Sequence, residues 1–375
     1  TPMHSMSMPP ISIIITAHNM QDCLETCLSS ISSQTFDNFY AIIIEDGSSD
    51  DTFRIAQNHS EHDRRFIAIH SNHQNVAKAR NQGLRLISTP YFMIVDGDDV
   101  FHPSMLEKMM SSIIEYDADI AVCDIVQFNN VTHKKTPAPW ALRTSQLPTK
   151  PFTSWQDIPG NVFAAFMGWP WDKLYRTDFV KLYDLNFPEN LGNSEDMLFT
   201  YRAIVLARRI TIIDEVLIEH RIDRKGSVSN SRLNDPLAFY RGIGLMKDFL
   251  QDLPNDAWKL LQHDYLNWAL DWTLWNIETL PTKEAQSDLI WRLHKNEFLH
   301  LELAEHDPSY FTGYPRSLAR YASLLNDFTS TDADKGPLGP LDSLPYGKYK
   351  PWSQANILEK IAIRARIIRN RPTEW

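Results

Sequence analysis

The sequence has few cysteines, no long apolar run and no excess of positive charge. Its 375 residues include only three cysteines, at positions 23, 27 and 123. This odd number, without the spacing of a metal site, argues against a disulfide framework and indicates a reducing compartment. No apolar run approaches the roughly 18 residues that a membrane span needs. The formal net charge of -10 argues against nucleic-acid binding as the main function. We therefore expect a cytoplasmic protein that binds no nucleic acid.

Both ends of the chain differ from the rest in composition. Residues 1–10 are rich in Met, Ser and Pro and lack the basic start and apolar core of a signal peptide, so we expect a disordered lead or an expression remnant there. Residues 329–352 are rich in Pro, Gly, Ser and Asp, which predicts a loop. Residues 354–371 predict a basic final helix. Residues 345–375 hold seven Lys or Arg against two Glu, a local balance of +5.

Short apolar runs alternate with helical stripes through the first part of the chain. The expected strands are residues 11–16, 41–45, 66–70, 91–95, 119–123, 210–213 and 216–218. Strand and helix repeating with short links predict an α/β protein with a mostly parallel sheet covered by helices on both faces. Beyond residue 233 the strand signals vanish and long helical stretches such as residues 258–275 take over. We expect a boundary there.

Polar clusters follow three of these strands, at residues 16–19, 46–48 and 96–99. Ligands of parallel sheets bind beyond the carboxyl ends of the strands, so the three clusters predict one shared site. Asp96 and Asp98 end an apolar strand and are separated by Gly97, which lets the backbone turn. A buried strand tolerates such charges only at its mouth, where they suit Mg²⁺ or Mn²⁺ and a phosphorylated ligand. Taken alone, the motif also fits an ordinary polar turn.

Six short motifs occur in a fixed order along the chain. They are residues 13–19 (IIITAHN), 44–50 (IEDGSSD), 79–83 (ARNQG), 95–99 (VDGDD), 171–175 (WDKLY) and 194–199 (SEDMLF). Together they resemble the family-two glycosyltransferases of GT-A fold, enzymes that move a sugar from a nucleotide donor with inversion. The resemblance spans residues 11–229. It implies a GT-A-type nucleotide-binding sheet with a donor half (residues 11–125), an acceptor half (residues 126–232) and a mainly helical C-terminal region (residues 233–375).

The resemblance also implies roles for donor-site residues. Asp98 resembles the direct ligand of Mn²⁺ or Mg²⁺, and Asp96 resembles the residue that holds the ribose and helps to place the metal. Asp46 resembles the aspartate that accepts a hydrogen bond from the N3–H of the base, which favours UDP. Asp99 either supports these acids or is a solvated acid at a helix start. Further residues expected at the donor are Thr16, His18, Asn19, Lys78 and Arg80.

Two more groups of residues complete the predicted site. Arg221 and Arg224 suit the donor diphosphate, and the His220 imidazole suits a third metal position, unless the segment is a surface loop with a packed histidine. By resemblance, Asp196 is the general base that takes the acceptor proton and Glu195 orients the acceptor, although an acidic pair at a helix start is also a favourable dipole partner. Trp169, Trp171 and Asp172 are expected at the acceptor or cleft wall, while for the tryptophans a place in the core is the alternative.

The sequence therefore predicts a metal-dependent inverting glycosyltransferase that uses a UDP-sugar and acts on a saccharide or a lipid-linked saccharide. The C-terminal helices would recognise the acceptor and contact a membrane surface or a second copy, or form a simple helical cap. One alternative is a nucleotidyltransferase that makes sugar nucleotides, but such enzymes open with a glycine-rich, lysine-bearing loop that residues 16–20 do not provide. A second alternative is a non-catalytic nucleotide- or glycan-binding module.

Overall fold

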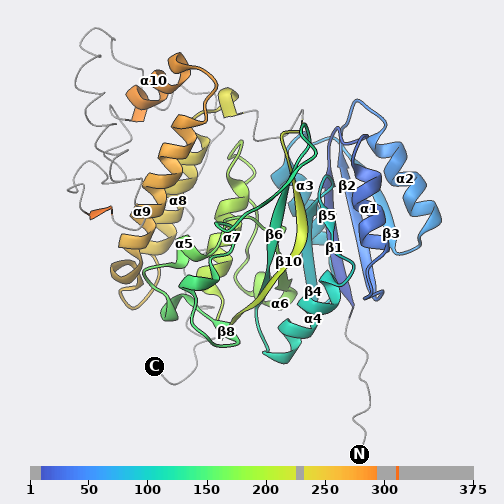
Figure 1. Cartoon of the computed structure of the whole chain (residues 1–375), viewed down its shortest axis with the longest axis horizontal. Helices are drawn as coiled ribbons and strands as arrows, with labels where there is room; N and C mark the ends of the chain where they lie inside the picture. Colours follow the sequence, from blue (N-terminus) through green and yellow to red (C-terminus); the bar gives the residue numbers. More distant parts are fainter. Residues whose placement is uncertain (1–9, 225–231, 294–309, 312–375) are drawn as a thin grey trace, which may run out of the picture.

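A computed structural model describes residues 10–224, 232–293 and 310–311. Its centre is one ten-stranded sheet with helices on both faces (Figure 1). Nearly all of the predicted leading segment (residues 1–9 of 1–10), the predicted loop at residues 329–352 and the basic final helix lie outside the described residues. Among the helices described, none is both long and apolar enough to span a bilayer.

The first four main strands form a parallel sheet. These strands are β1 (Ile11–Ala17), β2 (Phe39–Asp46), β3 (Phe66–Ser71) and β4 (Tyr91–Asp96), in the spatial order β3-β2-β1-β4. The chain adds β2 and β3 on one side of β1 and then returns to place β4 on the other side. The neighbouring strands β1 and β4 therefore form a topological switch point, where open α/β sheets bind their ligands.

The second half of the sheet is mixed. Here β9 (Lys173–Arg176) lies between β4 and β6 (Ile120–Asn129) and runs antiparallel to both. Next comes β10 (Ile210–Ile222), parallel to β6, and then the short antiparallel β5 (Val100–Phe101). Two further short strands are β7 (Lys135–Pro137), which pairs with β6, and β8 (Phe152–Thr153), which pairs with β10. The prediction of two separate strands within residues 210–218 is wrong, because β10 continues through two register shifts.

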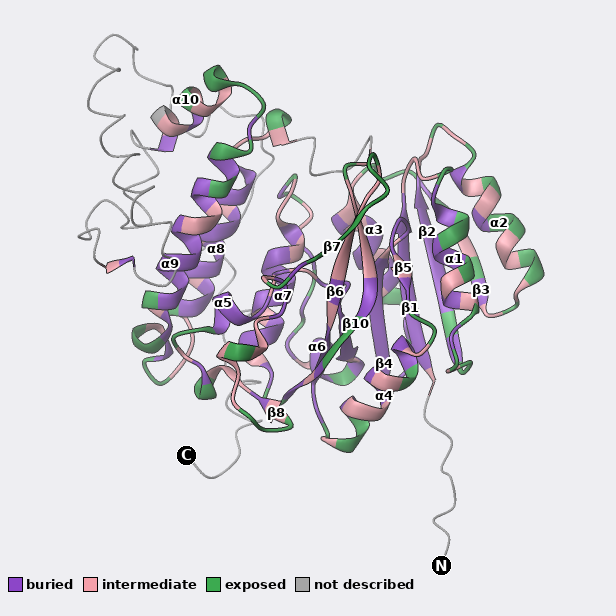
Figure 2. Ribbon diagram, in the orientation of Figure 1, coloured by how far each residue is buried: buried purple, intermediate pink, exposed green. Residues whose placement is uncertain are grey.

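The sheet separates two hydrophobic cores, because successive side chains of its strands point to opposite faces. Ile13 and Ile15 pack in one core with α1 (Leu24–Ser32), α2 (Thr52–His62) and α4 (Met105–Glu115). Ile14 packs in the other core with α3 (Val76–Leu86), α6 (Thr177–Leu182) and α7 (Glu195–Leu206). Figure 2 shows the central strands β1 and β4 as almost entirely buried. The predicted α/β sheet with helices on both faces is confirmed.

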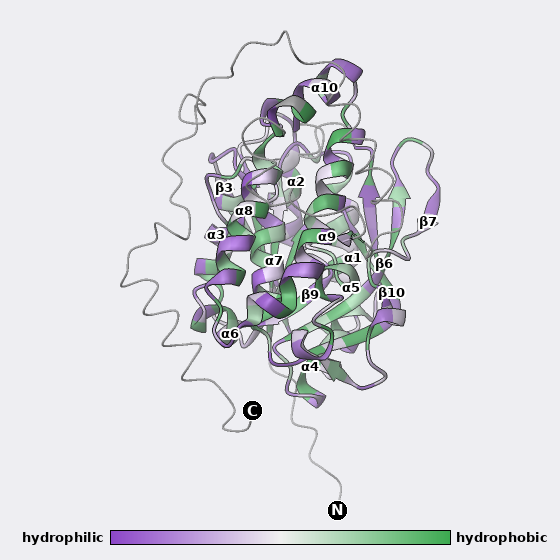
Figure 3. Ribbon diagram, turned by 90° about the vertical axis from the view of Figure 1, so that its left-hand side faces the viewer, coloured by the Kyte–Doolittle hydropathy of each residue, from purple (hydrophilic) through white to green (hydrophobic). Residues whose placement is uncertain are grey.

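The remaining helices extend the second core. They are α5 (Val162–Ala165), α8 (Ala238–Gln251), α9 (Ala257–Glu278) and α10 (Lys283–Arg292). Residues of α8 and α9 belong to the same buried cluster as α7 and the sheet. Figure 3 views this side, with hydrophobic positions along both helices. The helical region after β10 thus packs directly onto the sheet domain.

Candidate active site

The site forms where the carboxyl ends of β1, β2 and β4 meet. Thr16 of β1 pairs in register with Ile44 of β2 and with Asp96 of β4, so the residues that follow these strands share one rim. The Thr16 hydroxyl donates to Asp96 Oδ1 at 3.2 Å. A Cβ at Gly97 would lie 3.1 Å from the Thr16 carbonyl oxygen, so a larger residue there would require the turn after β4 or β1 to shift by a few tenths of an ångström.

The turn after β1 is bound to the turn after β2. Asn19 has a left-handed backbone (φ 49°), a conformation that asparagine tolerates better than most residues. Its backbone N–H donates to Ser48 Oγ, and its Oδ1 accepts the Ser49 N–H, each at 2.9 Å. His18 Nδ1 lies 2.9 Å from the carbonyl oxygen of Asp46. The predicted donor residues His18 and Asn19 therefore lie on a rim that the protein itself holds rigid.

Asp46 binds the loop that leads into α3. Its carboxylate accepts the backbone N–H groups of His73 at 2.6 Å, Gln74 at 3.1 Å and Asn75 at 2.7 Å, and the residue is 5% exposed. A carboxylate has about four acceptor positions, so these three bonds leave capacity for one more donor. Lys78 lies on the first turn of α3 and is half-buried.

Arg80 connects the strand end to the acidic pair. This α3 residue is 4% exposed and donates from one guanidinium nitrogen to Asp96 Oδ1 and from another to Glu195 Oε1, each at 2.9 Å. Its guanidinium also lies 5.3 Å from the centre of the Phe187 ring. The prediction placed Arg80 at the donor, and the structure shows its charge shared between the buried Glu195 and the half-buried Asp96. No sequence signal linked it to Glu195, 115 positions away.

The acidic pair Glu195 and Asp196 begins α7. Glu195 is 5% exposed, and burial raises its pKa to about 7, helped by the charge of Asp196 and opposed by Arg80. Burial also raises the pKa of Asp196, whose Oδ1 accepts the Met197 N–H at 2.7 Å. Ser194, just before the helix, has a left-handed backbone (φ 66°) that turns the pair into place. A desolvated carboxylate of raised pKa is suited to accept a proton.

Two arginines from the end of β10 reach the turn after β4. Arg224 donates to Asp98 Oδ2 at 2.7 Å and to the Asn19 carbonyl oxygen at 3.0 Å. Arg221 donates to the Asp98 carbonyl oxygen at 2.9 Å and to the side chain of Asn130 at 2.8 Å. The predicted residues Asp98, Arg221 and Arg224 are thus brought together. Asn130 was missed, because it lies in a stretch without periodicity.

Asp99 is fully buried, so the alternative that it is a solvated acid is wrong. Its Oδ1 lies 2.9 Å from His220 Nδ1 and accepts the Arg221 backbone N–H at 3.0 Å. Its Oδ2 is buried without a hydrogen-bond partner. Burial raises the pKa of Asp99 to about 6 against the opposing effect of His220, and the three nearby aspartates raise the pKa of His220 despite its own burial. Asp99 fixes the orientation of the His220 ring.

The predicted acceptor wall divides into exposed and buried parts. Trp171 is 3% exposed and belongs to the core, with its ring stacked 4.3 Å from that of His220. Trp169 is half-buried, 4.7 Å from Trp171. Asp172 is 1% exposed and forms an ion pair with Lys173 at 2.5 Å. Of the three, only Trp169 has appreciable exposed surface.

Within the described residues, no group of three or more His, Cys, Asp or Glu side chains is arranged as a metal site. One carboxylate oxygen of Asp96 and one of Asp98 each form an ion pair with an arginine. His220, the third predicted ligand, pairs with Asp99 through Nδ1. Each aspartate keeps its second oxygen outside these ion pairs, and His220 keeps Nε2. Carboxylate oxygens at the rim are hard donors of the type that Mn²⁺ and Mg²⁺ prefer, so Asp96 and Asp98 are the side chains that would hold such an ion.

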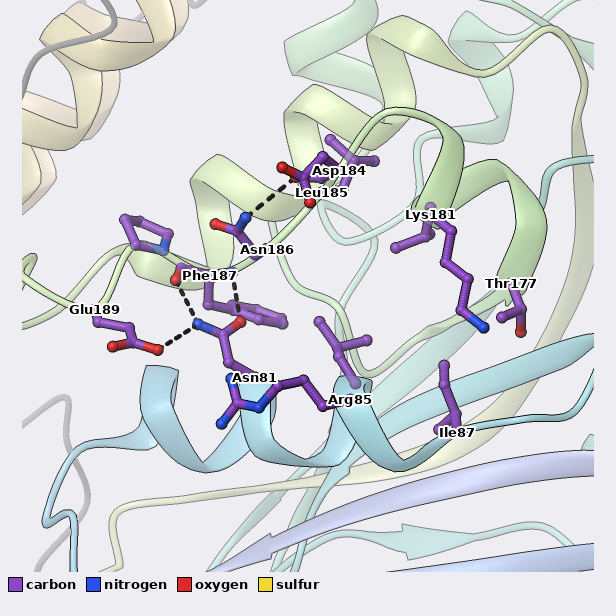
Figure 4. Close-up of a pocket in the computed structure, with 13 residues that line it drawn as sticks. Asn81, Arg85, Ile87, Thr177, Lys181, Asp184, Leu185, Asn186, Phe187 and Glu189 are labelled. Carbon is purple, nitrogen blue, oxygen red and sulfur yellow. Dashed lines mark hydrogen bonds between the residues drawn. The ribbon is translucent and has the colours of Figure 1, made fainter. Parts of the chain in front are cut away.

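A pocket of about 490 Å³ lies apart from these acids, between α3, α6 and the segment before α7 (Figure 4). Its apolar lining includes Ile87, Leu185 and Phe187. Asn81 holds one wall, because its amide donates to the Phe187 carbonyl oxygen at 2.8 Å and to Glu189 at 3.0 Å. The segment that forms this wall leads along the chain to Glu195 at the start of α7.

Comparison with known proteins finds similarity to glycosyltransferases. Residues 12–169 match the model of glycosyl transferase family 2. The Bacillus subtilis proteins EpsH and EpsJ, both named as glycosyltransferases, are each 28% identical, over 58% and 57% of this chain and 62% and 61% of their own lengths. The chain thus spans less than two thirds of these relatives.

Solved structures share the fold. Staphylococcus aureus TarS 1-349 in complex with UDP-GlcNAc is 18% identical, with a TM-score of 0.65 over 90% of this chain and 99% of that one. The mannosyltransferase PcManGT of Pyrobaculum calidifontis, in complex with GDP-Man and Mn²⁺, is 14% identical, with a TM-score of 0.54 over 88% and 89%. The family model matched over residues 12–169, the related glycosyltransferases and the shared fold together support a family-2 glycosyltransferase.

Proposed function

We propose that the chain transfers a sugar from a UDP-sugar to a hydroxyl group of a saccharide or lipid-linked saccharide, with inversion and with the help of Mn²⁺ or Mg²⁺. The observation that carries the proposal is the bridge from Asp96 through Arg80 to Glu195. It joins the predicted donor end of the site, at the β1/β4 switch point, to the predicted catalytic pair. Donor and acceptor chemistry then take place on the two sides of one buried guanidinium.

Asp46 and the turn after β1 would hold the nucleoside. Asp46 is fixed by three backbone N–H groups and retains acceptor capacity, which suits the N3–H of uracil. Guanine also offers a ring N–H donor, so this contact alone does not define the base. Of two solved structures with this fold, one was determined with UDP-GlcNAc and the other with GDP-Man. The identity of the nucleotide base therefore has to be tested by experiment.

Charge develops on the diphosphate as the sugar–oxygen bond breaks. Arg221 and Arg224 bind the turn at Asp98 and supply fixed positive charge there. The contact between Asp99 and His220 Nδ1 fixes the orientation of the imidazole ring. A divalent cation held by Asp98 and Asp96 would add charge neutralisation of the leaving diphosphate. The protein residues thereby orient the donor before any bond changes.

Asp196 would accept the proton of the attacking hydroxyl. Burial raises its pKa, which strengthens it as a base while it remains ionised. Glu195, held by Arg80, would bind and orient the acceptor hydroxyl. Attack from the side opposite the leaving diphosphate inverts the anomeric carbon in a single displacement.

A thermal-shift panel tests the proposal directly. The panel compares UDP, GDP and a thymidine diphosphate, each with Mn²⁺, with Mg²⁺ and with EDTA. We expect the largest shift with UDP and a divalent ion. A shift with GDP but not with UDP would overturn the base assignment. Release of pyrophosphate from UTP and a sugar 1-phosphate, without release of UDP from a UDP-sugar, would overturn the transferase assignment.

A further inference from the structure

The helix α5 is a single turn that cannot be stable by itself. It has four residues, all buried, and its N-cap residue Asn161 makes no side-chain capping bond. One isolated turn of helix fixes many dihedral angles for few hydrogen bonds, so its stability must come from its neighbours. The chain runs from α5 directly into residues 166–171, which carry the two tryptophans beside His220.

A carboxylate from α9 binds the start of α5. Asp264 is 3% exposed, and its Oδ2 accepts the backbone N–H of Phe163 at 2.9 Å. The N–H of Val162 stabilises the same carboxylate. Free N–H groups at the start of a helix need acceptors, and here a residue about 100 positions away provides one. Asp264 lies far beyond the segment that matches the family model, residues 12–169.

Two further side chains bind the segment that follows. The hydroxyl of Tyr201, on α7, donates to the Phe166 carbonyl oxygen at 2.9 Å. Lys173 donates to the carbonyl oxygens of Met167 at 3.0 Å and Trp169 at 2.8 Å. The segment is thus held from α9 at its start, from α7 in its middle and from β9 at its end.

The same segment supports the donor side of the site. Trp171 stacks on His220 with ring centres 4.3 Å apart, and the Trp169 ring lies 5.6 Å from it. The other side of His220 is bound to Asp99. The position of His220 therefore depends on residues 166–171 on one side and on the turn after β4 on the other.

We propose that Asp264 is a positioning residue, through which the C-terminal helices fix residues 162–171 and thereby the His220 side of the donor site. The proposal rests on the proposed function for the role of His220 at the diphosphate. It makes the helical region beyond β10 part of the catalytic unit, since one of its charged groups completes a helix of the sheet domain.

The test compares Asp264→Ala and Asp264→Asn with Asp256→Asn. Asp256 also lies at α9, but its side chain is 73% exposed, makes no capping bond and pairs only with the exposed Lys259 among the described residues. Hydrogen exchange is measured for peptides covering residues 162–171 and residues 11–17. UDP affinity is measured by calorimetry with Mn²⁺, well below the unfolding temperature of each variant.

We expect Asp264→Ala to speed exchange in residues 162–171 and weaken UDP binding, each about tenfold, the size of one lost hydrogen bond to a charged group. Exchange in residues 11–17 should not change. Asp264→Asn keeps one acceptor oxygen and should show a smaller effect, while Asp256→Asn should match the wild type. If the alanine variant does not fold, the asparagine variant decides by the same two measurements.

Two results would overturn the positioning role. One is unchanged exchange in residues 162–171 of a folded Asp264 variant. The other is faster exchange there with wild-type UDP affinity, which would confine Asp264 to local stability. If the wild-type protein binds no UDP, the proposed donor is refuted instead. The exchange rates of residues 162–171 would then show whether Asp264 of α9 stabilises α5.

Discussion

Replacing Arg80 by Met should unfold the protein more easily, and by an amount that depends on pH. The Arg80 side chain is 5% exposed and separates two carboxylates, that of the buried Glu195 and that of Asp96, whose side chain is 23% exposed. Removing one partner from a buried ion pair costs about 3–5 kcal/mol, because the remaining charge has no compensation. Met fills much of the same volume, so the loss should come mainly from charge.

The pH dependence follows from Glu195. Its pKa is about 7 in the folded protein and 4.5 as a free side chain, so the folded state binds the proton more tightly and stability falls as pH rises between these values. Without Arg80 the folded pKa rises further. From about pH 6 to about pH 8 the wild type should lose about 1.4 kcal/mol through this group, and the variant more, up to about 2.7 kcal/mol if the carboxyl stays protonated throughout. The penalty of Arg80→Met should therefore grow by about 1 kcal/mol.

Chemical denaturation at the two pH values measures this difference. Arg85→Met is the matched control, because Arg85 lies on the same helix, is exposed and makes no ion pair with the described residues. It should change stability by less than about 0.5 kcal/mol at either pH. A penalty for Arg80→Met that is small, or that shrinks as pH rises, would refute the view that Arg80 holds the charge of these carboxylates.

Three further predictions concern the pair, the buried acid of α9 and the cation. Asp196→Asn should lower transfer by about two to four orders of magnitude and leave UDP affinity unchanged; normal turnover in a UDP-release assay would remove Asp196 as the base. The pKa of Asp264 is about 7 in the folded state, so wild-type stability falls as pH rises towards 7. Asp264→Asn removes this loss, and its penalty in denaturation curves should shrink by about 2 kcal/mol from about pH 5.5 to about pH 8.5; a constant penalty would contradict the raised pKa. Mn²⁺ should increase the stabilisation by UDP by a few degrees over EDTA, and Asp98→Asn should abolish that increase; an equal shift in EDTA would exclude a bridging ion.

Much of the donor half could be predicted because its signals are local. Residues 11–16 and 91–95 are apolar runs that end abruptly in polar residues, and both are strands whose carboxyl ends meet at the site. The order of the motifs predicted that Asp46, Asp98 and the acidic pair Glu195 and Asp196 share one site. In the structure these residues lie on or next to one rim. The comparisons support the resemblance to family-2 glycosyltransferases, while the roles of these residues stay predictions.

Other features depend on contacts between distant residues. The strand β9 was not predicted, because it begins with Lys173 next to Asp172, a charged pair typical of a loop. The two charges neutralise each other inside the protein, which permits their burial. Asp214 and Glu215 suggested a break between two strands, whereas register shifts let β10 pass them. The bond from Asp264 to α5 leaves no trace in local sequence.

The place of β9 in the sheet has a consequence for folding during synthesis. Its four residues, Lys173–Arg176, lie between β4 and β6, although β6 is complete about 45 positions earlier in the chain. Until β9 emerges from the ribosome, β4 presents an unpaired apolar edge, and the strand groups on either side of β9 have no backbone bond between them. Unpaired edges recruit other strands, and closure of such long loops is slow. Truncated chains that end before residue 173 should therefore aggregate or bind chaperones, and those that extend past residue 176 should do so less.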